Sequence, residues 1–268
     1  MFPPKRIVCL TEETVETLYL LGEEDRIVGV SGFVVRPPAA RRDKPRVSAF
    51  TSADTEKILA LNPDLVFTFS DLQADIVAEL IRAGLQVHAF NHRTVAGIFD
   101  MMRMVGAMVG ADAKAKALAN DLEARLAAAR ERSSTLARRP KVFFEEWDEP
   151  LITAIGWVAE LIEIAGGDYV FPGHARKGAA KDRIVAHADV VAAAPDIIIG
   201  SWCGKKFSPK RVAARPGFAE TPAVRDGRLH EIKSAIILQP GPAALTDGLD
   251  ALEKIIHGWV GERAFGLD

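Results

Sequence analysis

The chain contains an approximate internal repeat, and this feature constrains the fold more than any other. Residues 56–70 read EKILALNPDLVFTFS, and residues 188–201 read ADVVAAAPDIIIGS. Each stretch predicts the end of an amphipathic helix, then a Pro-Asp turn, then a continuous apolar strand. Two such units in one chain indicate two similar lobes.

Each half of the chain also opens on a predicted strand and helix. Residues 6–10 lead to a helix that ends near Gly22, and residues 141–144 lead, after a loop, to a helix that ends near Gly166. Glycine suits these ends because it adopts the left-handed conformation without steric cost. Continuous apolar strands that alternate with helices are typical of parallel sheets covered on both faces. The predicted fold class is therefore α/β, with two Rossmann-like lobes.

The segment between the halves predicts one long α-helix. Residues 112–135 are rich in Ala, Leu, Glu, Lys and Arg, with leucines at four-residue steps. At about 1.5 Å per residue this helix spans roughly 35 Å. We expect an N-terminal lobe over residues 1–111, a connecting helix over 112–138 and a C-terminal lobe over 139–268. Because a helical connector is stiff, the lobes should rock by small angles only.

Composition excludes several classes of function. The 268 residues carry a net charge of −2, so no basic field favours nucleic acid as a partner. No stretch approaches the roughly 20 apolar residues that a membrane-spanning helix needs. Cys9 and Cys203 lack metal-ligand spacing, and no metal or cofactor is expected. The first residues show no export signal, so we expect either a mature chain with a new Met or a cytoplasmic protein.

Polar, charged and aromatic residues follow the predicted strands. In open parallel sheets, ligands bind beyond the carboxyl ends of the strands, so these residues are candidates for a binding site. They are Thr11, Glu12 and Glu13; Ser31, Gly32, Phe33 and Arg36; Ser70, Asp71 and Gln73; Asn91 and His92; Glu145, Glu146 and Trp147; and Ser201, Trp202, Cys203, Lys205 and Lys206.

Several of these residues also have a local structural explanation. Thr11 is a suitable N-cap, and acids in a first helical turn complement the helix dipole. Ser70 and Asp71 are candidate caps of the next helix. Trp147 and Trp202 are different, because a large aromatic residue just past a strand is expected at the rim and suits a flat ligand.

No catalytic motif is present in the sequence. It contains no Gly-rich phosphate loop, no His-Glu-x-x-His, no Gly-x-Ser-x-Gly and no Cys-x-x-Cys. Glu145 and Glu146 are candidates for acid–base chemistry, but neighbours on a strand point to opposite faces, so at most one would face a substrate.

Taken together, these segments resemble the helical-backbone class of periplasmic substrate-binding proteins, which bind vitamin B12 and ferric siderophores. The resemblance covers nearly the whole chain, and the order and spacing of its motifs carry it. They are residues 6–10 (RIVCL), 16–22 (ETLYLLG), 26–30 (RIVGV), 45–47 (PRV), 56–66 (EKILALNPDLV), 150–153 (PLIT), 160–167 (ELIEIAGG), 222–232 (PAVRDGRLHEI) and 240–242 (PGP).

The resemblance implies a shallow cleft between two lobes, no enzymatic activity, and delivery of the ligand to an ABC permease by a monomeric protein outside the cytoplasm. It also implies permease docking through an acidic residue on each lobe. Glu56 occupies the first position; the second holds Ala188, with Asp189 beside it. Aromatic residues are implied to sandwich a corrinoid. The candidate ligand-binding residues are Glu12, Phe33, Arg36, Phe50, Phe69, Asp71, Gln73, Glu146, Trp147, Trp202 and Lys205.

Alternatives to a corrinoid-binding importer component remain. A ferric siderophore or haem is the second ligand class, although acids outnumber bases at the strand ends, which favours a neutral or cationic ligand. A cytoplasmic metal-chelate carrier is a further possibility. A chelatase-like enzyme on the same fold would use Glu145 or Glu146 with His92.

Overall fold

The computed structural model describes residues 2–264, which divide into two compact units. The first contains residues 2–92, 96–122 and 240–242; the second contains residues 93–95, 123–239 and 243–264. The expected division treated residues 112–138 as a separate connector. The structure instead has one helix, α6 (Asp112–Ser134), whose residues up to Leu122 pack with the first unit and whose later residues pack with the second.

The first unit is a five-stranded parallel sheet in the order β3-β2-β1-β4-β5. Its strands are β1 (Ile7–Cys9), β2 (Ile27–Ser31), β3 (Arg46–Ser48), β4 (Leu65–Phe69) and β5 (Val87–Phe90). Its helices are α1 (Glu12–Leu20), η1 (Glu24–Arg26), α2 (Pro38–Asp43), α3 (Thr55–Ala60), η2 (Asp71–Gln73), α4 (Ala74–Arg82) and α5 (Val95–Val109). Strands and helices alternate as predicted.

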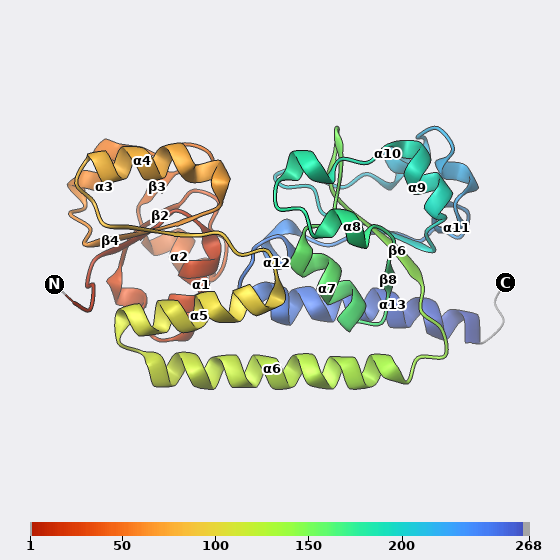
Figure 1. Ribbon diagram of the computed structural model, residues 1–268, viewed down its shortest axis with the longest axis horizontal. Helices are drawn as coiled ribbons and strands as arrows, with labels where there is room; N and C mark the ends of the chain where they lie inside the picture. The colour runs from red at the N-terminus through yellow and green to blue at the C-terminus, as the bar shows by residue number, and fades with distance from the viewer. Residues whose placement is uncertain (1, 265–268) are drawn as a thin grey trace. The chain divides into compact units, whose positions relative to one another are not determined.

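Helices cover both faces of this first sheet, with α3 and α4 on one side and α1 and α5 on the other (Figure 1). Alternation along the strands explains why both faces are apolar. Val8, Leu10 and Val66 pack with Ile58 of α3 and Leu80 of α4. The residues between them point the other way and are equally buried.

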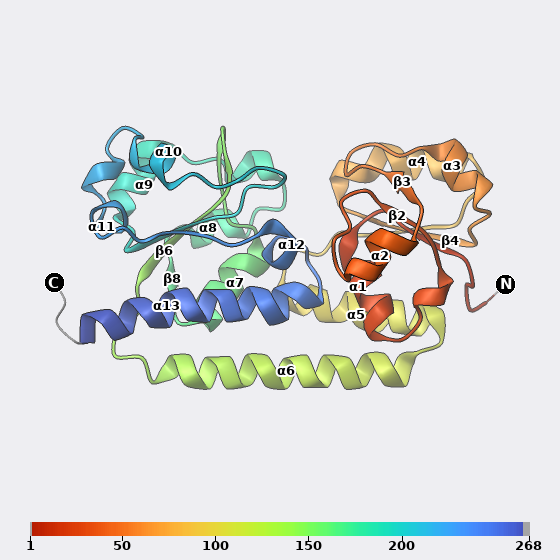
Figure 2. The ribbon, with the colours of Figure 1, turned by 180° about the vertical axis from the view of Figure 1, so that it is seen from behind.

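The second unit contains strands β6 (Lys141–Asp148), β7 (Leu151–Thr153), β8 (Asp168–Tyr169), β9 (Ile197–Gly200) and β10 (Leu229–Glu231), in the order β10-β9-β6-β7 with β8 also on β6. Its helices are α7 (Gly156–Ile164), α8 (Pro172–Ala175), η3 (Ala180–Arg183), α9 (His187–Ala193), α10 (Pro209–Ala213), η4 (Phe218–Glu220), α11 (Pro222–Arg225), α12 (Ser234–Ile237), the π-helical turn η5 (Ala244–Gly248) and α13 (Leu249–Ala264). Helices α7 and α13 lie side by side beneath this sheet (Figures 1 and 2).

One strand of the second sheet differs from the prediction. Strand β6 does not end at Phe144 but continues through Glu145, Glu146 and Trp147 and turns into the antiparallel strand β7. The apolar residues stop at Phe144, but the strand continues. The charged residue Glu145 does not end it, because its side chain is buried and paired with Arg215.

The predicted repeat is confirmed as α3–β4 in the first unit and α9–β9 in the second. In each, a left-handed residue precedes the proline: φ is 45° at Asn62 and 47° at Ala194. A residue before proline is disfavoured in the right-handed helical region, so the helix ends there.

The aspartate of each Pro-Asp turn then binds the start of the unit's first strand. Asp64 accepts hydrogen bonds from the backbone N–H groups of Lys5 and Arg6 at 2.9 and 3.0 Å, and Asp196 accepts one from Lys141 at 2.8 Å. The repeat therefore ties each outer helix–strand pair to the central strand of its own sheet.

The glycines predicted to end helices have the expected conformation, with φ of 69° at Gly22 and 96° at Gly166. In the described part of the chain, no helix combines the length and apolar character that crossing a bilayer requires.

Candidate functional site

The carboxyl edge of the first sheet gathers several predicted residues. Thr11, Glu12 and Glu13 follow β1, Phe33 and Arg36 follow β2, and Asp71 and His92 follow β4 and β5. Because all five strands are parallel, these segments emerge at the same edge.

Two adjacent acids at this edge are buried at the start of α1. Burial, followed by repulsion from Glu13 and Glu16, raises the pKa of Glu12 to about 8. Burial also raises the pKa of Glu13 to about 7, against the lowering effect of its hydrogen bond with Thr11. The second oxygen of Glu13, Oε2, has no hydrogen-bond partner among the described residues. At neutral pH Glu12 is therefore mostly protonated and Glu13 about half protonated, and a protonated carboxyl group donates a hydrogen bond as well as accepting one.

Thr11 does not cap α1 as predicted. Its hydroxyl donates to the Glu13 carboxylate instead of accepting a backbone N–H. Ser70 caps the turn η2, since its hydroxyl accepts from the N–H of Leu72, but neither Ser70 nor Asp71 caps α4 as predicted, because the N-cap position of α4 is Gln73.

Apolar and aromatic side chains are exposed at the same edge. Phe33 is 49% exposed and Leu72 is 56% exposed. Phe50 is half-buried, and the buried ring of Phe69 lies edge-on to His92 with centroids 5.2 Å apart. Leu72 was not among the residues predicted from the sequence, because a single leucine after a strand belongs to no pattern that indicates a binding site.

The remaining predicted residues of this edge have different settings. Asp71 is exposed in the turn η2. Arg36 forms an ion pair with Glu16, with 3.2 Å between Nε and Oε1. His92 Nε2 lies 2.9 Å from the carbonyl oxygen of Pro240.

Gln73 was predicted to contact ligand, and its position contradicts this. The side chain is fully buried, and its amide nitrogen donates to the carbonyls of Leu10 and Phe50 at 3.3 and 2.8 Å. Its amide oxygen accepts from the Phe69 N–H at 3.0 Å. Gln73 therefore connects the loops of this edge, and its side chain has no surface to offer a ligand.

In the second unit, Trp202 is buried rather than exposed at a rim. It is only 3% exposed, and its ring lies 5.1 Å from that of Phe207 within a hydrophobic cluster. The loop after β9 folds back over the sheet, which explains the burial. The indole Nε1 donates to Glu145 Oε1 at 2.9 Å.

Glu145 also accepts two hydrogen bonds from Arg215, each at 2.7 Å. Burial raises the pKa of Glu145, while the Arg215 guanidinium and the Trp202 indole act in the opposite direction. The neighbouring Glu146 pairs with the buried Arg183 at 2.5 and 3.0 Å. Each glutamate binds a different arginine, but the register of β6 is irregular between Glu145 and Trp147, so the prediction that adjacent glutamates face opposite ways stays a prediction.

The third acid on β6, Asp148, was not among the predicted residues. Lys205 Nζ lies 2.7 and 2.6 Å from its two oxygens, and Arg211 lies 3.0 Å from Oδ2. Burial by itself would raise the pKa of Asp148, but the hydrogen bonds and charge of Lys205, together with the charge of Arg211, hold it below its usual range. The Lys205 ammonium also lies 5.2 Å from the Trp147 ring and 5.1 Å from the Trp202 ring.

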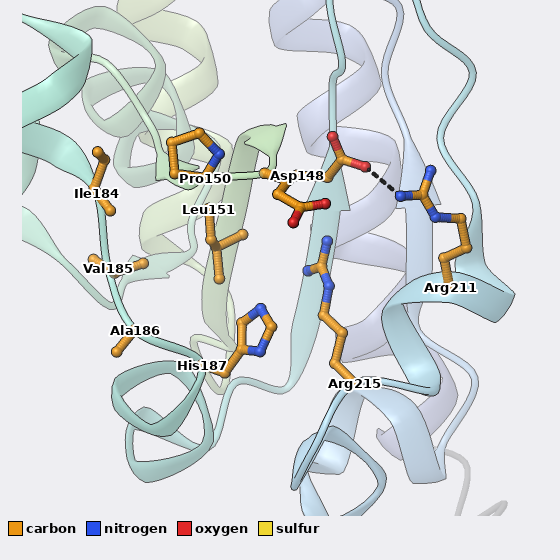
Figure 3. Close-up of a pocket in the computed structure, with 10 residues that line it drawn as sticks. Asp148, Pro150, Leu151, Ile184, Val185, Ala186, His187, Arg211 and Arg215 are labelled. Atoms are coloured by element: carbon orange, nitrogen blue, oxygen red, sulfur yellow. Dashed lines mark ion pairs between the residues drawn. The ribbon is translucent and has the colours of Figure 1, made fainter.

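A cavity of about 490 Å³ lies beside this ion-pair network, within the second unit. It is lined by the tip of the β6–β7 hairpin, by residues 184–187 and by two arginines near α10 (Figure 3). Its lining residues are Asp148, Glu149, Pro150, Leu151, Ile184, Val185, Ala186, His187, Arg211 and Arg215.

The two predicted docking acids are both exposed. Glu56 lies in the first turn of α3, and Asp189 lies in the first turn of α9. The Asp189 carboxylate accepts from the N–H of Ala186 at 3.1 Å, so it also caps its helix. Among the described residues, no three His, Cys, Asp or Glu side chains come together as a metal site.

Comparison with known proteins shows which family this chain matches and which proteins it is similar to. Residues 7–236 match the periplasmic binding protein family. YvrC of Bacillus subtilis, an uncharacterized ABC transporter substrate-binding lipoprotein, is 26% identical over 267 residues, covering 95% of this chain and 80% of YvrC. A vitamin B12-binding protein of Vibrio parahaemolyticus is 23% identical over 259 residues, covering 94% of this chain and 89% of the relative.

A solved structure agrees with the sequence relatives. The periplasmic heme-binding protein RhuT from Roseiflexus, in its apo form, gives a TM-score of 0.78 at 26% identity, covering 94% of this chain and 98% of RhuT. By name, these relatives are binding and transport proteins, and the resemblance predicted from the sequence is confirmed. With the match spanning both α/β units, the chain belongs to the periplasmic binding protein family.

Proposed function

We propose that this chain is the substrate-binding component of an ABC-type importer and that its ligand is a corrinoid such as cobalamin. Family membership supports the transport role, and the vitamin B12-binding relative supports the ligand class. In this proposal the protein binds and delivers its ligand without enzymatic activity, as a monomer outside the cytoplasm.

The observation that carries the choice of ligand is the chemistry of the first sheet's carboxyl edge. Phe33 and Leu72 are exposed there, and Glu12 follows the central strand with a pKa of about 8. A protonated carboxyl group can donate to a carboxamide oxygen, and exposed apolar side chains suit the face of a macrocycle. Corrinoids carry neutral carboxamides around a large ring, which this edge would accommodate.

A titration tests the proposal. Purified protein is titrated with cobalamin while tryptophan fluorescence is recorded, and saturable quenching is expected at about micromolar ligand. Absence of quenching in that range would count against a corrinoid.

A matched pair of variants then tests whether the carboxyl edge of the first sheet contacts the ligand. Phe33→Ala should weaken cobalamin binding by about tenfold, as for an aromatic anchor. Leu20→Ala is the control, because Leu20 is similarly exposed, at 53% against 49%, and lies at the other end of α1. Equal effects of the two substitutions would remove Phe33 from the site.

An anionic metal chelate, such as haem or a ferric siderophore, is the second candidate. Lys205, Lys206, Lys210 and Arg211 follow β9, whereas the acids beside them, such as Asp148, are buried and paired. The sequence-based argument that acids outnumber bases therefore does not hold for the segment after β9. The same titration with haemin separates the two candidates. A protein that binds haemin but not cobalamin would favour the anionic chelate.

The chelatase-like alternative finds little support in the site. Glu145 and Glu146 are held by arginines, and His92 contacts a backbone carbonyl. None of the three side chains is presented together with another as a metal-ligand set.

Permease docking through Glu56 and Asp189 is part of the proposal. Their exposure is compatible with that role. Glu56→Lys should abolish cobalamin-dependent growth of a host that relies on this protein, without altering cobalamin affinity. Lys57→Glu provides a neighbouring charge reversal as control, since Lys57 is also exposed on α3.

A further inference from the structure

The cavity at the β6–β7 hairpin has the properties of a small-molecule site in its own right. Its volume of about 490 Å³ is formed by residues of the second unit alone. Pockets of roughly 300–1,000 Å³ are typical of small-molecule sites.

One wall of this cavity is apolar. Pro150 and Leu151 come from the hairpin, and Ile184, Val185 and Ala186 come from the segment that enters α9. Ile184 is 43% exposed, which is a large apolar exposure for one side of a polar cavity. A ligand with an apolar body would cover it.

The opposite wall carries two guanidinium groups and an imidazole. Figure 3 shows the Arg211 guanidinium turned toward Asp148, and Arg215 on the side of the cavity away from Ile184 and Val185, with His187 beside it. The ring of His187 packs edge-on against Phe218, with centroids 5.5 Å apart.

Buried carboxylates hold the two arginines in place. Arg215 is fixed by its two-bond contact with Glu145, and Arg211 by Asp148. A guanidinium has five N–H donors, and these contacts use two from Arg215 and one from Arg211. The groups are therefore oriented in advance and retain donors for a further acceptor.

Two arginines and two acids, Asp148 and Glu149, line the cavity, and the chain segment beside it is cationic. Residues 201–219 contain Lys205, Lys206, Lys210, Arg211 and Arg215 and no Asp or Glu. Glu145 and Asp148 offset part of this charge and are buried. Glu149 also lines the cavity, but its side chain is on the exposed hairpin tip.

We propose that this cavity binds a small organic anion, a carboxylate or phosphate monoester carried on a short apolar body. The anionic group accepts hydrogen bonds from Arg211 and Arg215. The apolar body lies against Leu151, Ile184 and Val185. The residues of this site all belong to the second unit, whereas the proposed corrinoid contacts belong to the first, and its test uses no cobalamin, so failure of one proposal leaves the other standing.

The test uses hexanoate and hexyl phosphate as probes and hexanamide as the uncharged control. Protein labelled at Ile, Leu and Val methyl groups is titrated by NMR. Saturable shifts of the Leu151, Ile184 and Val185 methyls are expected, with hexanoate or hexyl phosphate binding at least about tenfold tighter than hexanamide. Which anion binds tighter identifies the headgroup. Equal binding of anion and amide, or shifts elsewhere only, would overturn the proposal.

A matched pair of variants on α10 sharpens the test. Arg211→Gln and Lys210→Gln each remove one positive charge, but only Arg211 lines the cavity. Arg211→Gln should weaken hexanoate binding by about tenfold and leave hexanamide unaffected, while Lys210→Gln changes hexanoate binding by less than about twofold. Equal losses would show a diffuse charge effect rather than a site. Arg215 is not substituted, since it holds Glu145; if Arg211→Gln unfolds, the comparison of anion with amide on the unsubstituted protein still decides.

Discussion

The carboxyl edges of the two sheets place buried acids in opposite electrostatic settings. In the first unit, Glu12 and Glu13 are buried with raised pKa values, and one oxygen of Glu13 has no hydrogen-bond partner in the part of the chain that the structure describes. In the second unit, Glu145 is equally buried but accepts two hydrogen bonds from Arg215 and one from Trp202. The first edge can hold neutral acids, and the second holds ion pairs.

The difference shows that counting acids after strands does not give the charge of a binding surface. A buried acid without a cation tends to be protonated, whereas a buried acid with a cation is neutralised as a pair. In both cases the acid contributes little net charge. In the segment after β9, residues 201–219, the charged residues are all cationic.

The largest expected difference in the free energy of unfolding is between variants of two aromatic residues, one from each edge. Trp202→Ala should lower the free energy of unfolding by about 3–5 kcal/mol, because it opens a cavity in the core and removes one of the three hydrogen bonds that Glu145 accepts. Phe33→Ala should lower it by less than about 1 kcal/mol, because Phe33 is half exposed. Urea denaturation measures both. Similar losses would show that the two aromatics share one role.

Breaking the ion pair of the second unit comes next. Arg215→Gln should lower the free energy of unfolding by about 3–4 kcal/mol, because it strands the buried Glu145 carboxylate. The double substitution Arg215→Gln/Glu145→Gln should recover part of this loss, since no buried charge is then left unpaired. A double variant no more stable than the single one would contradict this account.

The free energy of unfolding should depend on pH through Glu13, and the raised pKa of Glu13 sets the direction of this dependence. The pKa of Glu13 is about 7 in the folded protein against an ordinary 4.5, so the native state binds its proton more tightly than the unfolded state does. Its contribution is complete below about pH 4.5 and is lost as pH rises through 7, by about 3 kcal/mol in total. Glu12 extends the same trend to about pH 8.

Glu13→Gln should therefore remove much of this dependence. Denaturation at pH 5 and pH 8 should show the variant gaining on the unsubstituted protein at pH 8 by about 3 kcal/mol relative to pH 5. Asp148 should have the opposite effect. Because its pKa is lowered in the folded protein, ionised Asp148 contributes stability that is lost as pH falls. A Glu13→Gln protein with an unchanged pH profile would rule out an unpaired acid at this edge.

The smallest effect concerns Lys205. Lys205→Met keeps the apolar stem between Trp147 and Trp202 and removes the ammonium, while Arg211 remains paired with Asp148. We expect a loss of about 1 kcal/mol or less in unfolding free energy, since the side chain is partly exposed. A loss of several kcal/mol would mean that Lys205 is the main counter-ion of Asp148.

Much of the fold could be predicted from local patterns. The repeated Pro-Asp turns marked the ends of α3 and α9 and the starts of β4 and β9, and Gly22 and Gly166 marked helix ends. The course of β6 could not, because its charged residues look like a loop in sequence and only their distant partners keep them in the sheet.

The sequence by itself determined the two α/β units and the segments that reach each sheet's carboxyl edge, because helix ends, turns and apolar strands depend on neighbouring residues. Only the tertiary structure decided which acids are paired. Glu145 and Arg215 are 70 residues apart, and Gln73 is buried by loops 23 and 63 residues away. Burial and long-range pairing set the charge of each side chain at these edges, and neither can be read from residues next to one another along the chain.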